Sequence, residues 1–386
     1  MQGRSAVREA IRQHAARQYD GLLAVGKAAA SMTLGALDEI TQPERGLVIT
    51  KYDHLEGELQ NIDGFSIIES AHPIPDSNSL KAGQAGVEFV ASFSEQSHLL
   101  VLVSGGASSL MEQLPDSLNL ENLQWLNQAM LSKGWDIQRM NQFRSHLSRI
   151  KAGKLWQHFK GQHLDILAIS DVQGDSIEVI GSGIGSPNLV ELGKIEWPDE
   201  KLKVTETDEP AKSGAFQNRY SASVQIVASN QIARQAAANF ATESGFAVQH
   251  NEESLYADYQ ECANMIVNRL RQGGSGYYVW GGEPTVNLPD EPGNGGRNQA
   301  LALSIAMKIK DLEGIHVLCA GTDGTDGPTH AAGAMVNCET VKNLNEAEAA
   351  LIKADSGRYL DSQNALFVSG PTGTNVMDLV IAIKQD

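Results

Sequence analysis

The stretch GGEPTVNLPDEPGNGGRNQ (residues 281–299) joins a short aromatic run, YYVW (277–280), to a helical pattern, ALALSIAMKI (300–309). A strand that ends in glycines and continues as a helix brings backbone N–H groups and the positive end of a helix dipole into one crevice. Arg297 stands where this helix is expected to begin, and a cation there opposes the dipole. A bound anion would resolve that conflict, whereas for an isolated loop a solvated surface arginine is the simpler interpretation.

The same strand–loop–helix arrangement recurs along the chain, and this recurrence favours a ligand-binding role over a simple surface loop. Apolar strand-like runs alternate with helical patterns, which is typical of parallel sheets covered by helices on both faces. Ligands of such sheets bind outside the carboxyl ends of the strands. Polar glycine loops follow strand-like runs at 26–27, 104–109, 170–175, 281–283, 321–327 and 370–375. So many loops in equivalent positions are hard to explain as turns alone, and we expect a ligand site there.

The length of the chain, 386 residues, indicates two domains. Residues 188–220 are polar and charge-mixed with little periodicity, which favours an irregular excursion or linker. We therefore predict an α/β protein of two domains with mostly parallel sheets, the N-terminal one Rossmann-like. We place the domains at 1–225 and 226–386, although residues 226–275 could pack with either half.

Composition excludes several classes of partner. The net charge of -17 argues against nucleic acid or an anionic membrane surface, so local cations must hold any anionic substrate. The three cysteines are scattered and lack a C-x-x-C pair, which indicates reduced thiols instead of disulfides or a metal site. The chain shows neither a signal-peptide pattern nor an apolar run of transmembrane length, so a cytoplasmic location is the default expectation.

Two loops in the N-terminal half have the composition of phosphate-binding loops. GLLAVGKA places Lys27 at a strand–helix turn, where a lysine can contact phosphate as a point charge. This is not a Walker A loop, because its intervening residues are an apolar strand and Ala28 replaces the metal-binding Ser or Thr. SGGASS offers small residues with N–H groups that can cradle phosphate, and a tight turn is an equally good interpretation. Its members are Ser104, Gly105, Gly106, Ala107, Ser108 and Ser109.

Paired acids suggest a place for magnesium. Asp171 stands near Asp175, and Asp323 near Asp326. Mg²⁺ binds one or two carboxylates together with phosphate oxygens. The metal ligands remain open, with Asp171 and Asp175 as candidates, because an Asp before Gly is often only a turn residue. That alternative is strong for Asp326.

For other polar residues, a purely structural role is an alternative to ligand binding. If residues 144–154 are helical, Arg144, Ser148, Lys151 and Lys154 share one face, and a solvated basic stripe is then the more common outcome. Arg144 is our candidate for substrate binding on this face. Asp136 could cap a helix over IQRMNQFRSHLSRIKAGKLWQHF (137–159), which contains these residues.

Three further side chains lie near the loops of interest. Asn375 follows Thr-Gly-Thr at the expected start of a last helix, where it could be an N-cap residue. His72 and His146 are the histidines closest to the loops, and a structural role is the safer expectation for both. The inventory of cations, glycine loops and acids suits phosphoryl transfer, in which positioning and charge neutralisation carry most of the catalysis.

In their order along the chain, these motifs resemble the glycerate 2-kinase family, whose members have a DUF4147-type N-terminal part and a MOFRL-type C-terminal part. The resemblance runs from about residue 20 to the end, and it is most specific in the C-terminal motifs. The motifs are VGKAA, AHPIPD, LVSGGASSL, NQFRSHLSRIKAGKL, ISDVQGD, GGEPTV, GGRNQ, GTDGTDGPTHAAGA and GPTGTNVMDL.

The resemblance implies transfer of the ATP γ-phosphate to the 2-hydroxyl of D-glycerate with Mg²⁺, in a cleft between two α/β domains. The family's catalytic lysine and arginine correspond to Lys27 and Arg297. Its supporting acids and amide correspond to Glu283, Asp323 and Asn375, of which Glu283 and Asn375 are expected to bind substrate. Asp323 or Glu283 would orient or deprotonate the glycerate hydroxyl. The expected partners are D-glycerate and ATP, with a homodimer left open.

The chain departs from the family pattern at two places. SGIGSP (182–187) stands where a Ser-Gly-Pro-Thr stretch is usual, and KAGK (151–154) stands where Lys-Gly-Gly-Arg is usual. Both departures concern substrate specificity and nucleotide contacts and leave Lys27 and Arg297 in place. The alternatives are an NAD(P)-dependent hydroxypyruvate reductase, which the missing dinucleotide fingerprint disfavours, and a non-catalytic metabolite-binding relative.

Overall fold

The computed structural model describes residues 2–13, 17–135, 137–192 and 219–385. The chain forms two compact units, Gln2–Val227 and Ala228–Asp386, each with its own sheet and hydrophobic core. The stretch 196–210, the most polar part of the expected linker, and the expected cap Asp136 lie outside the described residues. None of the described helices combines the length and the apolar character that a membrane span needs.

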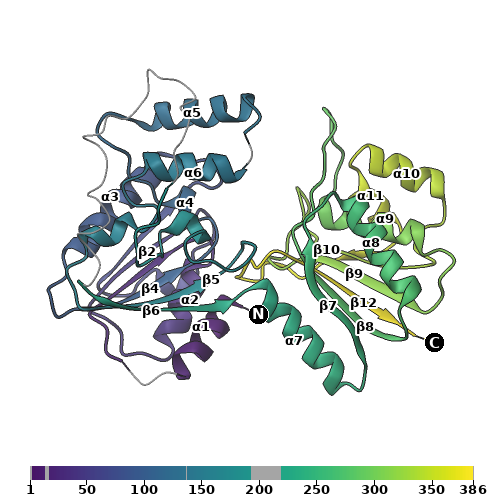
Figure 1. Ribbon diagram of the computed structural model, residues 1–386, viewed down its shortest axis with the longest axis horizontal. Coiled ribbons are helices and arrows are strands. Elements are labelled where there is room, and N and C mark those ends of the chain that lie inside the picture. Colours follow the sequence, from purple (N-terminus) through teal and green to yellow (C-terminus); the bar gives the residue numbers. More distant parts are fainter. Residues whose placement is uncertain (1, 14–16, 136, 193–218, 386) are drawn as a thin grey trace. The chain divides into compact units, whose positions relative to one another are not determined.

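The sheet of the first unit has the strand order β3-β2-β1-β4-β5-β6 (Figure 1). β1 pairs in parallel with β2 and β4, β2 with β3, and β4 with β5. This is the order of a doubly wound, Rossmann-type sheet, so the α/β prediction is confirmed. The strands are β1 (Gly21–Val25), β2 (Arg45–Lys51), β3 (Phe65–Ser70), β4 (His98–Val103), β5 (His163–Ile169) and β6 (Ser221–Ala228).

Helices cover both faces of this sheet, α1 and α2 on one face and α3 and α4 on the other. The central strand β1 is therefore buried along its whole length, as expected for an apolar run between two helical layers. α5 and α6 pack on each other around a separate small apolar core. The helices are α1 (Gly3–Arg12), α2 (Ala29–Leu37), α3 (Ser77–Ala91), α4 (Ala107–Leu110), α5 (Leu120–Ser132) and α6 (Ile137–Leu147). Short 3₁₀ turns are η1 (Gly57–Leu59), η2 (Lys154–His158) and η3 (Ile180–Gly183).

The expected helix through residues 144–154 is wrong. α6 ends at Leu147, and the chain then turns through Ala152 and Gly153, both with positive φ. The interpretation as a solvated basic stripe is wrong for its two lysines as well, because Lys151 and Lys154 are buried. Residues that a helical wheel places on one exposed face are instead folded into the interior.

The sheet of the second unit is mixed, with the order β11-β10-β9-β12-β8-β7. β7 pairs in parallel with β8, whereas β12 is antiparallel to β8 and β9, and β10 is antiparallel to β9 and β11. β7, β8, β9 and β11 thus run one way, and β10 and β12 the other. The strands are β7 (Val248–Leu255), β8 (Gly276–Gly282), β9 (Ile315–Gly321), β10 (Gly333–Asn337), β11 (Leu366–Phe367) and β12 (Asp378–Lys384).

The expected last helix after residue 375 is wrong, because residues 378–384 form β12 in the middle of this sheet. The run DLVIAIK is rich in β-branched residues and too short for a stable helix, and its burial alternates as in a strand. α8 and α9 pack together on one face of the sheet, and α7 lies on the other (Figure 1). The helices are α7 (Asn230–Glu243), α8 (Tyr259–Gln272), α9 (Arg297–Lys308), α10 (Leu344–Ile352) and α11 (Ser356–Ser362).

Candidate active site

In the first unit, the turn that carries Lys27 is tied to the SGGASS loop. β1 and β4 are neighbours, so the segments that follow them meet at the carboxyl edge of the sheet. The Lys27 N–H donates to the Gly105 carbonyl at 2.9 Å, and the Ala28 N–H donates to the Ser104 hydroxyl at 3.1 Å. Ser104 is buried, so its hydroxyl serves to join the two loops.

The side chains of Lys27 and His72 lie over Gly106 of this loop. It adopts a left-handed conformation with φ 86°, which glycine tolerates best, and it precedes the short helix α4. A Cβ atom at this position would lie 3.0 Å from Cδ2 of His72 and 3.1 Å from Cγ of Lys27. Lys27 and His72 therefore lie side by side above Gly106.

Lys27 has no competing partner in the described chain. Its side chain is half-buried, and none of the described residues accepts a hydrogen bond from its ammonium group or pairs with it. A lysine held at the end of a central strand beside a glycine loop is thus available to an anionic ligand.

Of the two acids that follow β5, Asp171 is the one that reaches the loop. A Cβ atom on Gly105 would lie 1.9 Å from Oδ2 of Asp171, so only a glycine leaves room for this carboxylate. Asp175 has a positive φ of 52°, and its N–H points to the Val172 carbonyl at 3.4 Å. Within the described residues, no group of three or more His, Cys, Asp and Glu side chains could hold a metal ion.

The two stretches that depart from the family pattern pack against each other. The Ala152 N–H donates to the Ser182 carbonyl and the Gly153 N–H to the Gly183 carbonyl, each at 2.9 Å. The Ser182 hydroxyl in turn donates to the Ser108 hydroxyl at 2.9 Å. The departures therefore form one structural unit, which touches the SGGASS loop at Ser108.

The basic residues after the loop hold the α5–α6 region together. The Arg144 guanidinium donates to Asn127 at 2.9 Å and to Asn141 at 3.3 Å, and burial lowers its pKa. Lys151 forms an ion pair with Glu112, and both side chains are almost fully buried. The structure thus engages Arg144 with other helix residues. None of these contacts joins it to the Lys27 cluster, by which we mean Lys27, His72 and the loop 104–109.

In the second unit, the sheet register creates a site at one edge. Asp378, the first residue of β12, pairs with Gly282 at the end of β8 and with Gly321 at the end of β9. Glu283 follows β8 directly, and Asp323 follows β9 by two residues. Acidic side chains from three adjacent strands therefore meet where the predicted helix α9 begins.

Arg297, the first residue of α9, is clamped between two of these acids. Its Nε donates to Oδ2 of Asp378 at 2.6 Å, and its Nη2 donates to Oδ1 of the same residue at 3.2 Å. Its Nη1 donates to Oε1 of Glu283 at 2.6 Å. The arrangement fixes the guanidinium plane through charge-assisted hydrogen bonds on two sides.

Asp378 is the residue of this candidate site that the sequence interpretation missed. Its side chain is only 2% exposed, whereas those of Arg297 and Glu283 are 34% and 47% exposed. Burial raises the pKa of Asp378 to about 6, although the Arg297 charge opposes that rise. Burial lowers the pKa of Arg297, and the two carboxylates raise it by more, so the arginine stays charged. A single acid directly before the apolar run LVIAI was the available signal.

The start of α9 is not an open anion site. Gly296 occupies the N-cap position without a side chain, and Asp326 from the loop after β9 replaces it. Asp326 accepts the N–H groups of Asn298 at 3.0 Å and Gln299 at 2.8 Å. The anion expected between the helix and Arg297 is therefore supplied by the protein itself, because Asp326 caps the helix and Asp378 pairs with the arginine. Asp326 is buried in this role, so it is more than a turn residue.

Asp323 and Asn375 lie beside the clamp in two neighbouring loops. Oδ1 of Asp323 accepts the Thr325 N–H at 3.0 Å, and the Asn375 side chain accepts the Met377 N–H at 3.1 Å. A Cβ atom on Gly321 would lie 3.3 Å from Oδ1 of Asp323 and 3.5 Å from Oδ1 of Asp378. The two carboxylates thus approach each other over a glycine.

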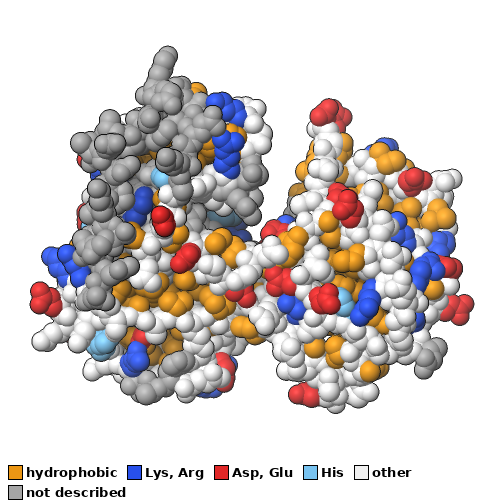
Figure 2. Space-filling model, in the orientation of Figure 1, with side chains coloured by type: hydrophobic (Ala, Val, Ile, Leu, Met, Phe, Trp, Pro, Cys, Tyr) orange, Lys and Arg blue, Asp and Glu red, His pale blue; other side chains and the backbone are white. Residues whose placement is uncertain are grey.

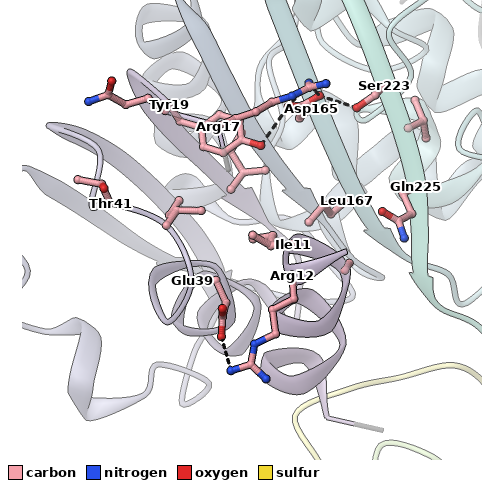
Figure 3. A pocket seen from close by; sticks show the side chains of 15 residues that line it. Ile11, Arg12, Arg17, Tyr19, Glu39, Thr41, Asp165, Leu167, Ser223 and Gln225 are labelled. Atoms are coloured by element: carbon pink, nitrogen blue, oxygen red, sulfur yellow. Dashed lines mark hydrogen bonds and ion pairs between the residues drawn. The ribbon is translucent and has the colours of Figure 1, made fainter. Parts of the chain in front are cut away.

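A large cavity of the first unit lies elsewhere, and it does not serve as the candidate site. It has a volume of about 710 Å³ and is lined by α1, the end of α2, and β4, β5 and β6. Figure 3 shows that Arg17, Tyr19 and Ser223 all point to Asp165, while Arg12 pairs with Glu39. Asp165 lies near the start of β5, away from the carboxyl edge, and these charged groups already satisfy one another.

The surface carries charges of both signs. On the face drawn in Figure 2, acidic and basic side chains of the described residues are interspersed over both units.

Comparison with known proteins gives consistent matches along the chain. The model of a domain of unknown function, DUF4147, matches residues 2–195, and the model of the MOFRL family matches residues 276–378. A D-glycerate 2-kinase from Thermotoga maritima is 36% identical over 94% of this chain and 90% of its own length. A glycerate 2-kinase from Pyrococcus horikoshii is 34% identical over 94% of this chain and 86% of its own length. The crystal structure of a glycerate kinase from Thermotoga maritima superimposes with a TM-score of 0.85 at 33% identity, covering 100% of this chain and 96% of that one.

Proposed function

We propose, because the chain belongs to the DUF4147–MOFRL family of glycerate 2-kinases, that it transfers the γ-phosphoryl group of ATP to the 2-hydroxyl of D-glycerate. The products are 2-phosphoglycerate and ADP. The observation that carries the proposal is the Lys27 side chain, whose Cγ lies over Gly106 and whose ammonium group has no partner among the described residues. Transfer of a phosphoryl group depends on cations that are available to its negative charge.

The first unit supplies the groups suited to nucleotide phosphates. In the proposal, Lys27 neutralises charge on the transferred phosphoryl group, and the loop 104–109 holds phosphate oxygens. The half-exposed members Gly106, Ser108 and Ser109 are the accessible part of that loop. Arg144 stays a prediction for substrate binding, with part of its guanidinium already engaged by Asn127 and Asn141.

The second unit supplies the groups suited to a hydroxyl. We assign Asp323 as the base that accepts the proton of the glycerate 2-hydroxyl, because its carboxylate is part-exposed beside the Arg297 clamp. The hydroxyl oxygen then bonds to the γ-phosphorus as the bond from that phosphorus to the ADP oxygen breaks. Arg297 neutralises charge on the phosphoryl group in transit, and Glu283 and Asn375 orient the substrate.

One carboxylate of the first unit is placed where it could bind Mg²⁺ beside the loop 104–109. Mg²⁺ needs few protein ligands when it is bound with a nucleotide, and Asp171 places one carboxylate against the loop at Gly105. We propose Asp171 as the protein ligand. When bound, the ion would neutralise phosphate charge.

The test is a coupled ADP-release assay with ATP, Mg²⁺ and D-glycerate, with the product identified by ³¹P NMR. Turnover that gives the 2-phosphate is the expected result. Turnover that gives the 3-phosphate would contradict the regiochemistry, and a folded sample without ADP release above the no-substrate control would contradict the choice of substrate. NADH consumption with hydroxypyruvate would instead support the reductase alternative.

A further inference from the structure

His72 lies in the Lys27 cluster, although the sequence suggested only a structural histidine. It follows β3, which is separated from β1 by β2, and its ring reaches back across the carboxyl edge of the sheet. A Cβ atom on Gly106 would lie 3.0 Å from its Cδ2 and 3.3 Å from its Nε2. The same point lies 3.1 Å from Cγ of Lys27. Residue 106 has no side chain, so the two groups face the same space.

Neither ring nitrogen of His72 is fully buried, so each can reach solvent or a ligand. None of the residues that the structure describes bonds to either ring nitrogen of His72. The nearby His54, in contrast, places its Nδ1 3.1 Å from the Tyr52 carbonyl. His72 is thus half-buried, unpaired and adjacent to an unpaired lysine.

We propose that the His72 imidazole and the Lys27 ammonium bind one anionic phosphoryl group above Gly106. The inference rests on the proposed function for the origin of that group, which is either the nucleotide or the phosphorylated product. Lys27 would contribute the charge, and a ring N–H of His72 would contribute a directional hydrogen bond. An imidazole is suited to this task because it can donate one hydrogen bond without carrying a second charge.

The surroundings of His72 keep it neutral in the absence of an anion. Burial, together with the smaller effects of the charges of Lys27, Lys51 and His54, lowers the pKa of His72 to about 4. Asp76 accepts the Ala71 N–H beside the ring, and Asp171 lies against the adjacent Gly105. A phosphate bound next to the ring would raise the pKa of His72, because a nearby negative charge favours the imidazolium form. Anion binding and proton uptake are therefore coupled.

The first experiment separates hydrogen bonding from packing. Dissociation constants for ADP and for 2-phosphoglycerate are measured by calorimetry at about pH 7.5 for the full chain, His72→Ala and His72→Gln. His72→Ala should weaken one of the two probes by about threefold to tenfold, the usual worth of one hydrogen bond. Gln can donate from nearly the position of Nε2, so His72→Gln should stay within about twofold of the parent chain. The probe that responds identifies the source of the phosphoryl group.

The matched control is His54→Gln, which changes an exposed histidine near His72 whose ring is already bonded to the backbone. It should leave both dissociation constants unchanged. Thermal melting checks that each variant is folded. Equal affinities of folded His72→Ala and the parent chain for both probes would overturn the proposal.

The second experiment uses the proton linkage. From about pH 7.5 to pH 5, the affinity of the parent chain for the responding probe should rise relative to that of His72→Gln by at least about threefold, since Gln does not titrate. The ratio cancels the titration of the ligand itself. A ratio that stays flat over this range would overturn the contact between His72 and the phosphate.

These measurements are independent of turnover. A parent chain that binds ADP in a His72-dependent way but does not phosphorylate D-glycerate would refute the proposed kinase reaction and leave the anion site intact. A chain that turns over D-glycerate with the same probe affinities in folded His72→Ala would refute the anion site alone.

Discussion

The two cations assigned to the reaction are held in opposite ways. Lys27 stands above a glycine loop without a partner among the described residues. Arg297 makes three hydrogen bonds to two carboxylates, one of them almost fully buried. The lysine is thus an accessible point charge, whereas the arginine is a fixed part of an acidic cluster.

This difference assigns the two cations different tasks. Around Arg297, the carboxylates Glu283, Asp378 and Asp323 outnumber the single positive charge, so a phosphate that settles there is opposed by negative neighbours. Two like charges about 4 Å apart repel by about 4 kcal/mol at the effective dielectric constant of a protein surface. We therefore expect Lys27 to be the better phosphate-binding cation, and Arg297 to orient groups and to act on charge that develops during transfer.

The largest effect is expected for Arg297→Ala. Activity should fall by about 100-fold to 1,000-fold, as for the loss of one donor to a developing charge. Stability should fall by about 3 kcal/mol at pH 7.5, because Asp378 then becomes a buried carboxylate without a cation. The loss should shrink towards acidic pH, where Asp378 takes up a proton. Steady-state kinetics and chemical denaturation at several pH values measure both quantities.

The double variant Arg297→Ala/Asp378→Asn is the matched control. It removes the unpaired charge, so most of the lost stability should return while the activity stays low. If stability stayed low in the double variant, the buried carboxylate would not be its cause.

Lys27→Ala should lose activity without losing stability. The ammonium group makes no ion pair with the described residues, so the free energy of unfolding should change by less than about 0.5 kcal/mol. kcat should fall by about 100-fold, because the phosphoryl group loses its accessible cation. Lys51→Ala, at the end of the neighbouring strand β2, is the control and should remain within a fewfold of the parent chain. A large loss of stability in Lys27→Ala would show that the lysine makes a stabilising contact within the protein.

Apolar runs followed by glycine loops made the first unit largely predictable from sequence. The loop that follows each apolar run identifies the carboxyl edge of a parallel sheet, and this is where Lys27, SGGASS and Asp171 lie. The position of His72 could not be predicted, since its ring reaches Gly106 through tertiary packing across β2. The burial of Lys151 was equally hidden, because its partner Glu112 is distant in sequence.

The second unit was harder to predict because its chain does not keep to alternating strands and helices. β12 inserts between β8 and β9 in the opposite direction, and its first residue, Asp378, thereby reaches Arg297 from 81 positions away. The sequence pattern favours a helix over this stretch, and no role for this carboxylate follows from it. β7 was missed for another reason: it is a polar edge strand, VQHNEESL, without a buried apolar run.

Asp378→Asn tests whether the clamp depends on a charged partner. The pKa of Asp378 is raised to about 6, so the carboxylate is ionised at pH 7.5 and becomes protonated as the pH falls through 6. kcat of the parent chain should therefore decline below about pH 6, and this decline should be absent from the variant, whose kcat at pH 7.5 should be about tenfold lower. An unchanged acidic limb in Asp378→Asn would assign that limb to another group.

The pH dependence of the stability of Asp378→Asn gives an independent check, because the pKa shift on folding fixes the direction of the change. A carboxyl group whose pKa is raised on folding stabilises the protein below its unfolded pKa, near 3.8, and loses that contribution as the pH rises to about 6. The parent chain should thus lose stability relative to the non-titrating variant over this interval. A difference that moves in the other direction would mean that Arg297 holds the pKa of Asp378 below its ordinary value.

The smallest effect is expected for Glu283→Gln, on the exposed side of the clamp. Its carboxylate is 47% exposed and bonds Arg297 through one oxygen, so its loss should cost less than about 0.5 kcal/mol of stability. Because Asp378 still holds the guanidinium on the buried side, the arginine should keep its place, and kcat should fall only about threefold to tenfold. The informative quantity is the split between kcat and KM for D-glycerate. A rise confined to KM would assign Glu283 to substrate binding, whereas a fall confined to kcat would show that both sides of the clamp are needed to hold Arg297 during transfer.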